Sequence, residues 1–340
     1  AKTLFPYTTL FRSILSACVG IGGYDIHLVD SLVTNCANPD AEDHAVLIRD
    51  AAEGISIRNT EMAALGISLM TGGGRSTMSG ANPRHLSVLG SWLRVPWSWW
   101  VRSSAGDPSG WCPSGALANQ TTSGHKWSCV ANAWVDGGVG RAAGPTADTY
   151  DDSYDKNGLD IKTGFGFEFR GNVFENGWQP GRYNQYGVAV LFNQVDSDTG
   201  DKTAGGRFAL FRHNIFRDRP LIAAAGIIGG VAAYVRRQGD FTFDHNLAYS
   251  IGGGEWMPNA VNPSSVGGFA LNDTGRVVIS NNTVSFGSAS GGLQTAGLLL
   301  TGNTGDSTSY MNTAELVFDA NVAAYGYRGA YAFNGMGASW

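Results

Sequence analysis

Asp160 and Lys162 are the residues of this sequence whose types and spacing most directly suggest chemistry. They alternate with Leu159 and Ile161, so a strand over residues 158–163 would place both charged side chains on one face and both apolar ones on the other. A lysine can act as a general base where burial and cationic neighbours lower its pKa, with a nearby carboxylate as its orienter or as a metal ligand. The alternative is a solvated i, i+2 ion pair, which contributes little to stability.

Other ionisable residues extend this candidate site. Arg49 lies on a similar segment, residues 45–50, and His44 comes just before it. Arg182 and Arg217, both expected in loops, could hold an anionic ligand through charged hydrogen bonds. The expected catalytic set is Lys162, Asp160, Arg49 and His44.

Tryptophan is concentrated in one part of the chain. Seven of the ten Trp residues fall between Trp92 and Trp134, which is more than a narrow β core would absorb. Exposed Trp faces stack on sugar rings, whereas the alternative is a small separate core closed by a Cys112–Cys129 disulfide. The expected ligand-contacting residues, some from later loops, are Trp97, Trp99, Trp100, Trp178, Arg182, Trp256 and Glu255.

An acidic segment offers a metal hypothesis. Asp151, Asp152 and Asp155 cluster in TADTYDDSYDKNG, and Ca²⁺ takes six to eight oxygen ligands from such segments. No Glu occupies the twelfth position that an EF-hand requires, and solvated turns explain the cluster equally well. We expect no required cofactor, with Ca²⁺ as the candidate ion.

A repeat supplies the elements that must position these residues. The pattern is apolar, any, apolar, any, any, Asn, any, apolar, as in FEFRGNVF, ALFRHNIF and FTFDHNLA. With Ser or Thr allowed in place of Asn, the corner residues are Ser31, Thr60, Ser91, Asn172, Asn214, Asn246, Asn282 and Asn321. The long interval from Ser91 to Asn172 contains an insertion at about residues 103–150.

The repeat has a direct structural meaning. Two apolar residues at spacing two form the inward face of a short strand, and the Asn marks a corner. We expect that Asn to adopt the left-handed backbone region and to bond the Asn stacked on it. Segments such as 45–50, 67–72, 158–163 and 187–192 predict a third strand per coil. This predicts an all-β, right-handed parallel β-helix with long loops along one edge of the third sheet, beside a groove.

Composition limits the function classes. Only 15% of residues are charged, 48 are Gly, and the net charge of −5 without a basic run argues against nucleic acid as a partner. No apolar run is long enough for a membrane helix. Two local cysteine pairs, Cys18 with Cys36 and Cys112 with Cys129, predict disulfides in an exported protein, with four buried thiols as the alternative.

The first thirteen residues are set aside from the fold prediction. LFPYTTLFRS matches the in-frame translation of a common sequencing adapter, so residues 1–13 are interpreted as an artefact. Residues 14–340 are expected to form one domain of a longer natural chain.

The coils and the Asn corner resemble the pectate-lyase-like superfamily, and NGLDIKTGFGFEFRGNVFENGW followed by YGVAVLF resembles a bacterial group within it. The resemblance implies an extracellular or cell-surface protein that binds a polysaccharide. It also implies lyase-type elimination on a uronate glycan as the first expectation, with Lys162 as base. The alternatives are a glycoside hydrolase, using Asp160 with Glu175 or Glu255, and a non-catalytic adhesin or structural solenoid.

Overall fold

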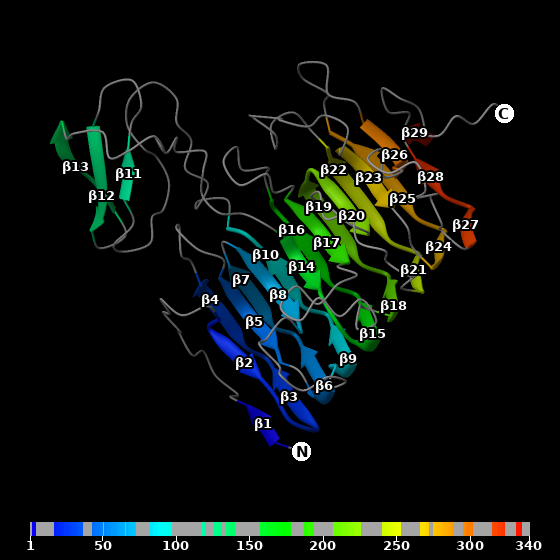
Figure 1. Cartoon of the computed structure of the whole chain (residues 1–340), viewed down its shortest axis with the longest axis horizontal. Coiled ribbons are helices and arrows are strands. Elements are labelled where there is room, and N and C mark those ends of the chain that lie inside the picture. Colours follow the sequence, from blue (N-terminus) through cyan, green and yellow to red (C-terminus); the bar gives the residue numbers. More distant parts are fainter. Residues whose placement is uncertain are drawn as a thin grey trace, which may run out of the picture.

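The computed structural model describes residues 2–4, 17–36, 43–49, 51–64, 66–72, 82–96, 117–119, 125–130, 133–139, 157–177, 187–192, 207–225, 240–252, 266–271, 275–287, 295–301, 315–323 and 331–334. Every regular element in this part is a β-strand, and most strands belong to three parallel sheets stacked along one axis (Figure 1).

We name the three parallel sheets A, B and C. Sheet A contains β1 (Lys2–Leu4), β3 (Ile26–Val29), β6 (Glu53–Arg58), β9 (Arg84–Leu89), β15 (Phe165–Arg170), β18 (Arg207–Arg212), β21 (Phe241–Asp244), β24 (Arg276–Ser280) and β27 (Glu315–Asp319). Sheet B contains β2 (Val19–Ile21), β5 (His44–Ile48), β8 (Ile67–Thr71), β14 (Asn157–Ile161), β17 (Val188–Phe192), β20 (Leu221–Ala225), β23 (Val266–Leu271), β26 (Thr295–Thr301) and β29 (Tyr331–Asn334). Sheet C contains β4 (Leu32–Cys36), β7 (Glu61–Ala64), β10 (Trp92–Arg94), β16 (Val173–Glu175), β19 (Ile215–Arg219), β22 (Leu247–Ile251), β25 (Thr283–Phe286) and β28 (Val322–Ala323).

The chain passes repeatedly through sheets B, A and C in that order, and each strand pairs in parallel with its counterpart one coil away. Parallel connections of this kind are right-handed, and the result is a right-handed parallel β-helix. The predicted fold is therefore confirmed, and the predicted third strands lie in sheet B. β20 was not predicted as a third strand, and β1 lies within the segment that the sequence analysis set aside.

The predicted corner residues all lie between sheet A and sheet C, where they form the expected ladder. Asn214 Oδ1 accepts hydrogen bonds from the backbone N of Asn172 (2.9 Å) and from its Nδ2 (3.1 Å). Asn214 Nδ2 in turn donates to the carbonyl oxygen of Phe169 (2.9 Å) and to Asn246 Oδ1 (3.0 Å). The ladder thus satisfies buried polar groups of adjacent coils at the same corner.

The prediction that the ladder residue itself adopts the left-handed backbone conformation is wrong by one residue. The left-handed residue precedes the ladder residue, as in His213 with φ of 56° and His245 with φ of 54°. The ladder side chain must point into the corner to reach the next coil, so the turn itself is made one position earlier. The residues with positive φ at this corner are Asp30, Asn59, Gly90, Gly171, His213, His245, Asn281 and Ala320.

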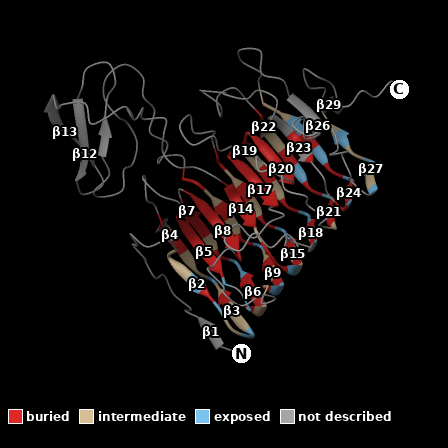
Figure 2. Ribbon diagram, viewed as in Figure 1, coloured by how far each residue is buried: buried red, intermediate tan, exposed pale blue. Residues whose placement is uncertain are grey.

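The core is a continuous apolar column inside the coils (Figure 2). Phe169, Phe211 and Phe243 lie at one position of adjacent sheet A strands and stack with centroids 4.6 Å apart. Phe174 and Phe216 make a second stack from sheet C at 4.8 Å. Because each coil repeats the same inward positions, like residues pack on like residues along the axis.

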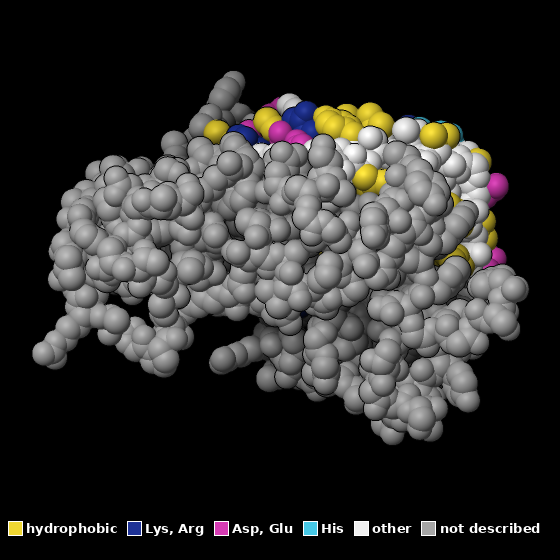
Figure 3. Space-filling view, turned by 90° about the horizontal axis from the view of Figure 1, so that it is seen from above, with side chains coloured by type: hydrophobic (Ala, Val, Ile, Leu, Met, Phe, Trp, Pro, Cys, Tyr) yellow, Lys and Arg dark blue, Asp and Glu magenta, His cyan; other side chains and the backbone are white. Residues whose placement is uncertain are grey.

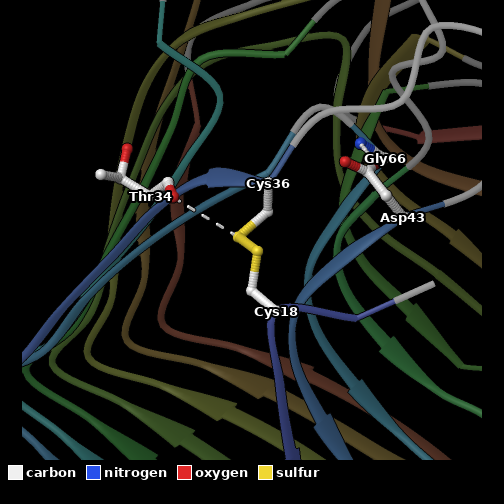
Figure 4. Close-up of a disulfide and its surroundings, with 5 residues drawn as sticks. All are labelled: Cys18, Thr34, Cys36, Asp43 and Gly66. Carbon is white, nitrogen blue, oxygen red and sulfur yellow. Dashed lines mark hydrogen bonds between the residues drawn. A yellow bond between two sulfur atoms is a disulfide. The ribbon is translucent and has the colours of Figure 1, made fainter. Parts of the chain in front are cut away.

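A disulfide closes the coil that contains β2, β3 and β4. Cys18 lies just before β2, Cys36 ends β4, and their sulfur atoms are bonded, so the first predicted pair is confirmed (Figure 4). Close by, the backbone N of Gly66 donates to Asp43 Oδ1 at 2.6 Å, which links two coils at the C–B corner. Cys112 lies outside the described residues.

The insertion contributes its own small sheet. Within the range predicted at about residues 103–150, three antiparallel strands are described, β11 (Leu117–Asn119), β12 (His125–Val130) and β13 (Ala133–Val139).

Long connections flank sheet B on both of its edges. The expected edge, between sheets C and B, carries the interval from β10 to β14. The connections from β17 to β18 and from β20 to β21 leave sheet B at its other edge. Long connections therefore both precede and follow strands of sheet B along the chain.

Candidate functional site

The predicted catalytic strand lies in sheet B, whose outward positions are buried. Leu159 and Ile161 belong to the core, so Asp160 points outward as predicted, yet it is 0% exposed. It pairs in register with Met70 on β8 and Leu191 on β17, which are 3% and 7% exposed. The described part of this face is thus a buried, largely apolar surface with one carboxylate in it (Figure 2).

The structure does not gather the four predicted catalytic residues into one cluster. Lys162 follows β14 and is partly exposed, whereas Arg49 follows β5 and is exposed. The two residues occupy equivalent positions two coils apart, and Gly72 occupies that position in the coil between them. A Cβ built on Gly20 would lie 3.1 Å from Arg49 Nε, so the guanidinium is turned towards β2 and away from Lys162. His44 is buried, 5% exposed, at the opposite end of its strand.

Several predicted site residues lie outside the described residues. They are Trp97, Trp99, Trp100, Trp178, Arg182, Glu255, Trp256, Asp151, Asp152 and Asp155. Among the described residues, no group of three or more His, Cys, Asp or Glu side chains could hold a metal ion. The same part contains no helix with the length and hydrophobicity of a membrane-spanning segment.

Two expectations about carboxylates and arginines are corrected. Arg217 was expected in a loop, but it lies on strand β19 of sheet C, because Ile215–Arg219 repeats the strand that follows each ladder residue. Asp160 and Glu175 were considered as a glycosidase pair, but they lie on sheets B and C. They therefore do not face each other across one sheet surface.

The outward face of sheet C is partly exposed and carries the best-defined functional surface among the described residues. Two outward positions recur, one and three residues after each ladder residue, and they form two rows that cross the strands. We call the following six residues the sheet C strip: Glu61, Trp92, Arg94, Glu175, Arg217 and Tyr249. Figure 3 shows acidic and basic side chains beside hydrophobic ones along the described rim.

Trp92 and Arg94 form the centre of the strip. The Arg94 guanidinium carbon lies 4.2 Å from the centroid of a Trp92 ring, a cation–π contact. Arg94 Nε also donates to Glu61 Oε1 at 2.8 Å, so one carboxylate and one ring hold the guanidinium. The indole Nε1 of Trp92 is buried and has no hydrogen-bond partner among the described residues, so within this part of the chain the ring is placed by packing and by Arg94.

A hollow of about 480 Å³ adjoins this centre. It runs along the A–C corner over four coils and offers both an apolar ring and groups that form hydrogen bonds. Asn59 Nδ2 donates to Asp30 Oδ1 at 2.7 Å on its rim. The lining residues are Asp30, Ser31, Leu32, Asn59, Thr60, Glu61, Gly90, Ser91, Trp92, Gly171 and Val173.

The second half of the strip has a similar arrangement. Arg217 Nη2 lies 2.8 Å from Glu175 Oε1, and Arg217 Nη1 donates to the Tyr249 hydroxyl at 2.9 Å. The bond to Tyr249, followed by those to Glu175, raises the pKa of Arg217. Next to it, burial raises the pKa of Asp218. Two glutamates and two arginines pair within the strip, so its charges balance.

The strip was missed because the repeat was used to find inward positions only. Trp92 was noted within the Trp-rich segment, but Glu61, Arg94 and Tyr249 carried no signal of their own. Counting one and three residues forward from each ladder residue would have identified all six positions.

No protein-family model matches the chain, and no curated protein matches it in sequence. Its structure is similar to a mutant tailspike protein of E. coli bacteriophage HK620 in complex with a pentasaccharide, with 11% identity and a TM-score of 0.49 over 99% of this chain and 44% of that one. It is also similar to the Streptococcus pneumoniae surface protein and adhesin PfbA, with 10% identity and a TM-score of 0.41 over 93% and 68% of the two chains. An alginate lyase from Paenibacillus sp. gives 10% identity and a TM-score of 0.34 over 90% and 78%. The chain spans less than half of the tailspike chain, and identities at this level do not transfer an activity.

Proposed function

We propose that this protein binds a polysaccharide along the sheet C strip. The observation that carries the proposal is the open hollow at the A–C corner, where the Trp92 ring lies beside hydroxyl, amide and carboxylate groups. A sugar presents an apolar ring face and a rim of hydroxyls, and it is recognised by an aromatic face with hydrogen-bonding groups around it. The strip continues across adjacent coils, as an extended chain of sugars requires.

The balance of charges in the strip favours a neutral stretch of glycan. Arg94 and Arg217 are already paired with Glu61 and Glu175, so neither offers an uncompensated positive charge to a ligand. Their remaining donors and acceptors match sugar hydroxyls. The Cys18–Cys36 disulfide is consistent with a protein that works outside the reducing cytosol.

Affinity electrophoresis through gels that contain a panel of neutral and acidic polysaccharides tests this proposal. We expect retardation by at least one neutral glycan and an affinity about two- to tenfold lower for Trp92→Ala, because an aromatic contact contributes roughly 0.5–1.5 kcal/mol. Trp92→Phe should retain most of the affinity, since the indole N–H makes no hydrogen bond with the described residues. Arg170→Gln, an exposed change on sheet A, serves as the control.

Lack of retardation by every glycan would refute binding. Equal retardation of wild type and Trp92→Ala would place the site elsewhere.

Lyase-type elimination with Lys162 as base is a second proposal, with a site of its own. Its support is Asp160, a fully buried carboxylate in an apolar row next to a partly exposed lysine. Ultraviolet absorbance of unsaturated products, measured with a panel of uronate polysaccharides, tests it. Activity that survives in Lys162→Ala would exclude this lysine as the base.

A further inference from the structure

A group of exposed rings lies at the opposite side of sheet A from the ladder, at the B–A corner. Phe165 and Phe208 are 42% and 50% exposed, and their rings meet edge to face with centroids 4.9 Å apart. The His85 ring lies 6.3 Å from Phe165 in a similar edge arrangement. We call His85, Phe165 and Phe208 the ring platform.

The backbone at the platform is strained at one bulky residue. In β6, β9 and β15 the second residue has positive φ and is one that tolerates this region: Gly54, His85 and Gly166. Asp25, just before β3, is in register with Gly54 and also has positive φ. Phe208 occupies the same position with φ of 55°, where a bulky side chain is an outlier. Strain retained at an exposed residue points to a function other than core packing.

Space around the platform is kept open by glycine. A Cβ built on Gly166 would lie 3.1 Å from the His85 ring, so a side chain there would displace it. His85 on β9, Gly166 on β15 and Phe208 on β18 are in register, so Gly166 lies between the two rings. The ring of the preceding residue, Phe165, contacts both His85 and Phe208. The three rings therefore form a continuous surface that is not part of the main core.

Arg84 lies next to the rings, between Glu53 and Phe165 in register, and has no ion-pair partner among the described residues. It is exposed and makes no side-chain hydrogen bond with the described residues. His85 Nδ1, by contrast, lies 3.6 Å from Glu53 Oε1, so that carboxylate is directed to the imidazole. An unpaired guanidinium can bind a carboxylate or sulfate through two parallel hydrogen bonds.

We infer that the ring platform and Arg84 form a second glycan-binding site, selective for a sugar that carries an anionic group. The sugar ring lies on Phe208 and Phe165, and its carboxylate or sulfate is bound by Arg84. An extended peptide is disfavoured, because β9, β15 and β18 are each paired on both sides and offer no free edge for strand addition. Nucleic acid is disfavoured by the net charge of −5. This inference does not rest on the sheet C strip, whose paired charges favour neutral sugars.

Isothermal titration of the whole chain with three hexasaccharides tests the site: a galacturonate oligomer, a sulfated heparin-derived oligomer, and neutral cellohexaose. We expect at least one anionic probe to bind at the platform, more weakly at higher salt, and the preferred probe identifies the anionic group. Phe208→Ala and Arg84→Gln should each reduce the affinity at least about fivefold. Trp92→Ala should leave this affinity unchanged, which separates the platform from the strip.

Arg170→Gln is the matched control, because Arg170 is an exposed arginine, without an ion-pair partner in the described part of the chain, at the far end of β15, the strand that carries Phe165. An equal loss in that variant would show non-specific charge attraction and overturn the inference. So would failure of both anionic probes to bind, or affinities unaffected by Phe208→Ala and Arg84→Gln. Equal competition by polyglutamate would identify an acidic peptide site instead, and dissociation of a wild-type oligomer by Phe208→Ala would identify a contact between copies.

Thermal unfolding of Phe208→Gly tests the premise independently of any ligand. Because glycine accepts positive φ, we expect the melting temperature to equal or exceed that of the wild type. A fall of several degrees would show that the ring stabilises the fold, and the inference would then lose its basis.

Discussion

Arg219 should be the most consequential single side chain at the C–B corner. It is 0% exposed and is among the largest fully buried side chains described. Its Nη1 donates to the carbonyl oxygens of Val188 (3.2 Å) and Gly187 (3.5 Å), and its Nη2 donates to that of Glu175 (3.3 Å). The guanidinium thus joins the end of β16 to the start of β17, which border the connection between these strands.

The surrounding backbone is shaped to the guanidinium. A Cβ on Gly158 would lie 3.0 Å from Arg219 Nη2, and one on Gly177 would lie 2.8 Å from Nη1. Arg219→Met keeps most of the apolar stem but removes every donor. Hydrogen bonds to a charged group contribute about 1.5–3 kcal/mol each, so losing the two shorter ones should lower the free energy of unfolding by roughly 3 kcal/mol or more.

Urea unfolding followed by circular dichroism measures this effect. Arg219→Lys keeps the charge but cannot reach three carbonyls, and it should fall between wild type and Arg219→Met. Arg170→Met, at an exposed arginine, should remain within about 0.5 kcal/mol of wild type. If Arg219→Met unfolds at the wild-type urea concentration, the cost of desolvating the guanidinium cancels its bonds, and our reasoning about this corner is refuted.

Three further predictions concern the scaffold. Asn246→Ala should destabilise the fold by roughly 2–4 kcal/mol in the same urea assay, because the carbonyl of Phe211 and the backbone N of Asn214 lose buried partners. Thr283→Ala, at an exposed position, is its control. Equal unfolding midpoints for the two variants would contradict the role of the ladder. Although burial alone would raise it, the pKa of Asp244 lies below its usual value because Asn281, Arg212, His245 and Ser280 bond the carboxylate. The ionised Asp244 carboxylate therefore contributes to stability above its unfolded pKa of about 3.9, and this contribution is lost as pH falls towards the native pKa. Asp244→Asn should flatten the acid limb of a plot of unfolding free energy against pH. An unchanged slope in that variant would argue against this role of Asp244. Reducing the Cys18–Cys36 disulfide should lower stability by about 3 kcal/mol, as expected for a loop of this length; a Cys18→Ser variant that matches the oxidised wild type in urea would contradict this.

The fold was predictable because a solenoid repeats its constraints. Every coil must place an amide or hydroxyl at the A–C corner, so Asn172, Asn214 and Asn246 recur in one sequence context. The left-handed residue was harder to assign, since Asp30, Gly90 and His213 share no side-chain chemistry. Only the direction in which the ladder side chain must point shows that the turn lies one residue earlier.

The choice of functional face was less predictable, because a period-two pattern separates the two faces of a strand without showing which outer face meets solvent. A signal against the sheet B groove was nevertheless present. The segments AVLI, ISLM and VAVLF are apolar at nearly every position, as parallel strands buried on both faces are. In sheet C, each inward residue alternates with outward ones such as Trp92 and Arg94, which is the pattern of a face open to solvent. Asp160 is then best understood as a carboxylate within a buried face, and a ligand would need access to that face to meet it. Glycan binding at sheet C and at the ring platform needs no such access, because the strip residues are partly exposed and the platform residues are exposed in the described structure.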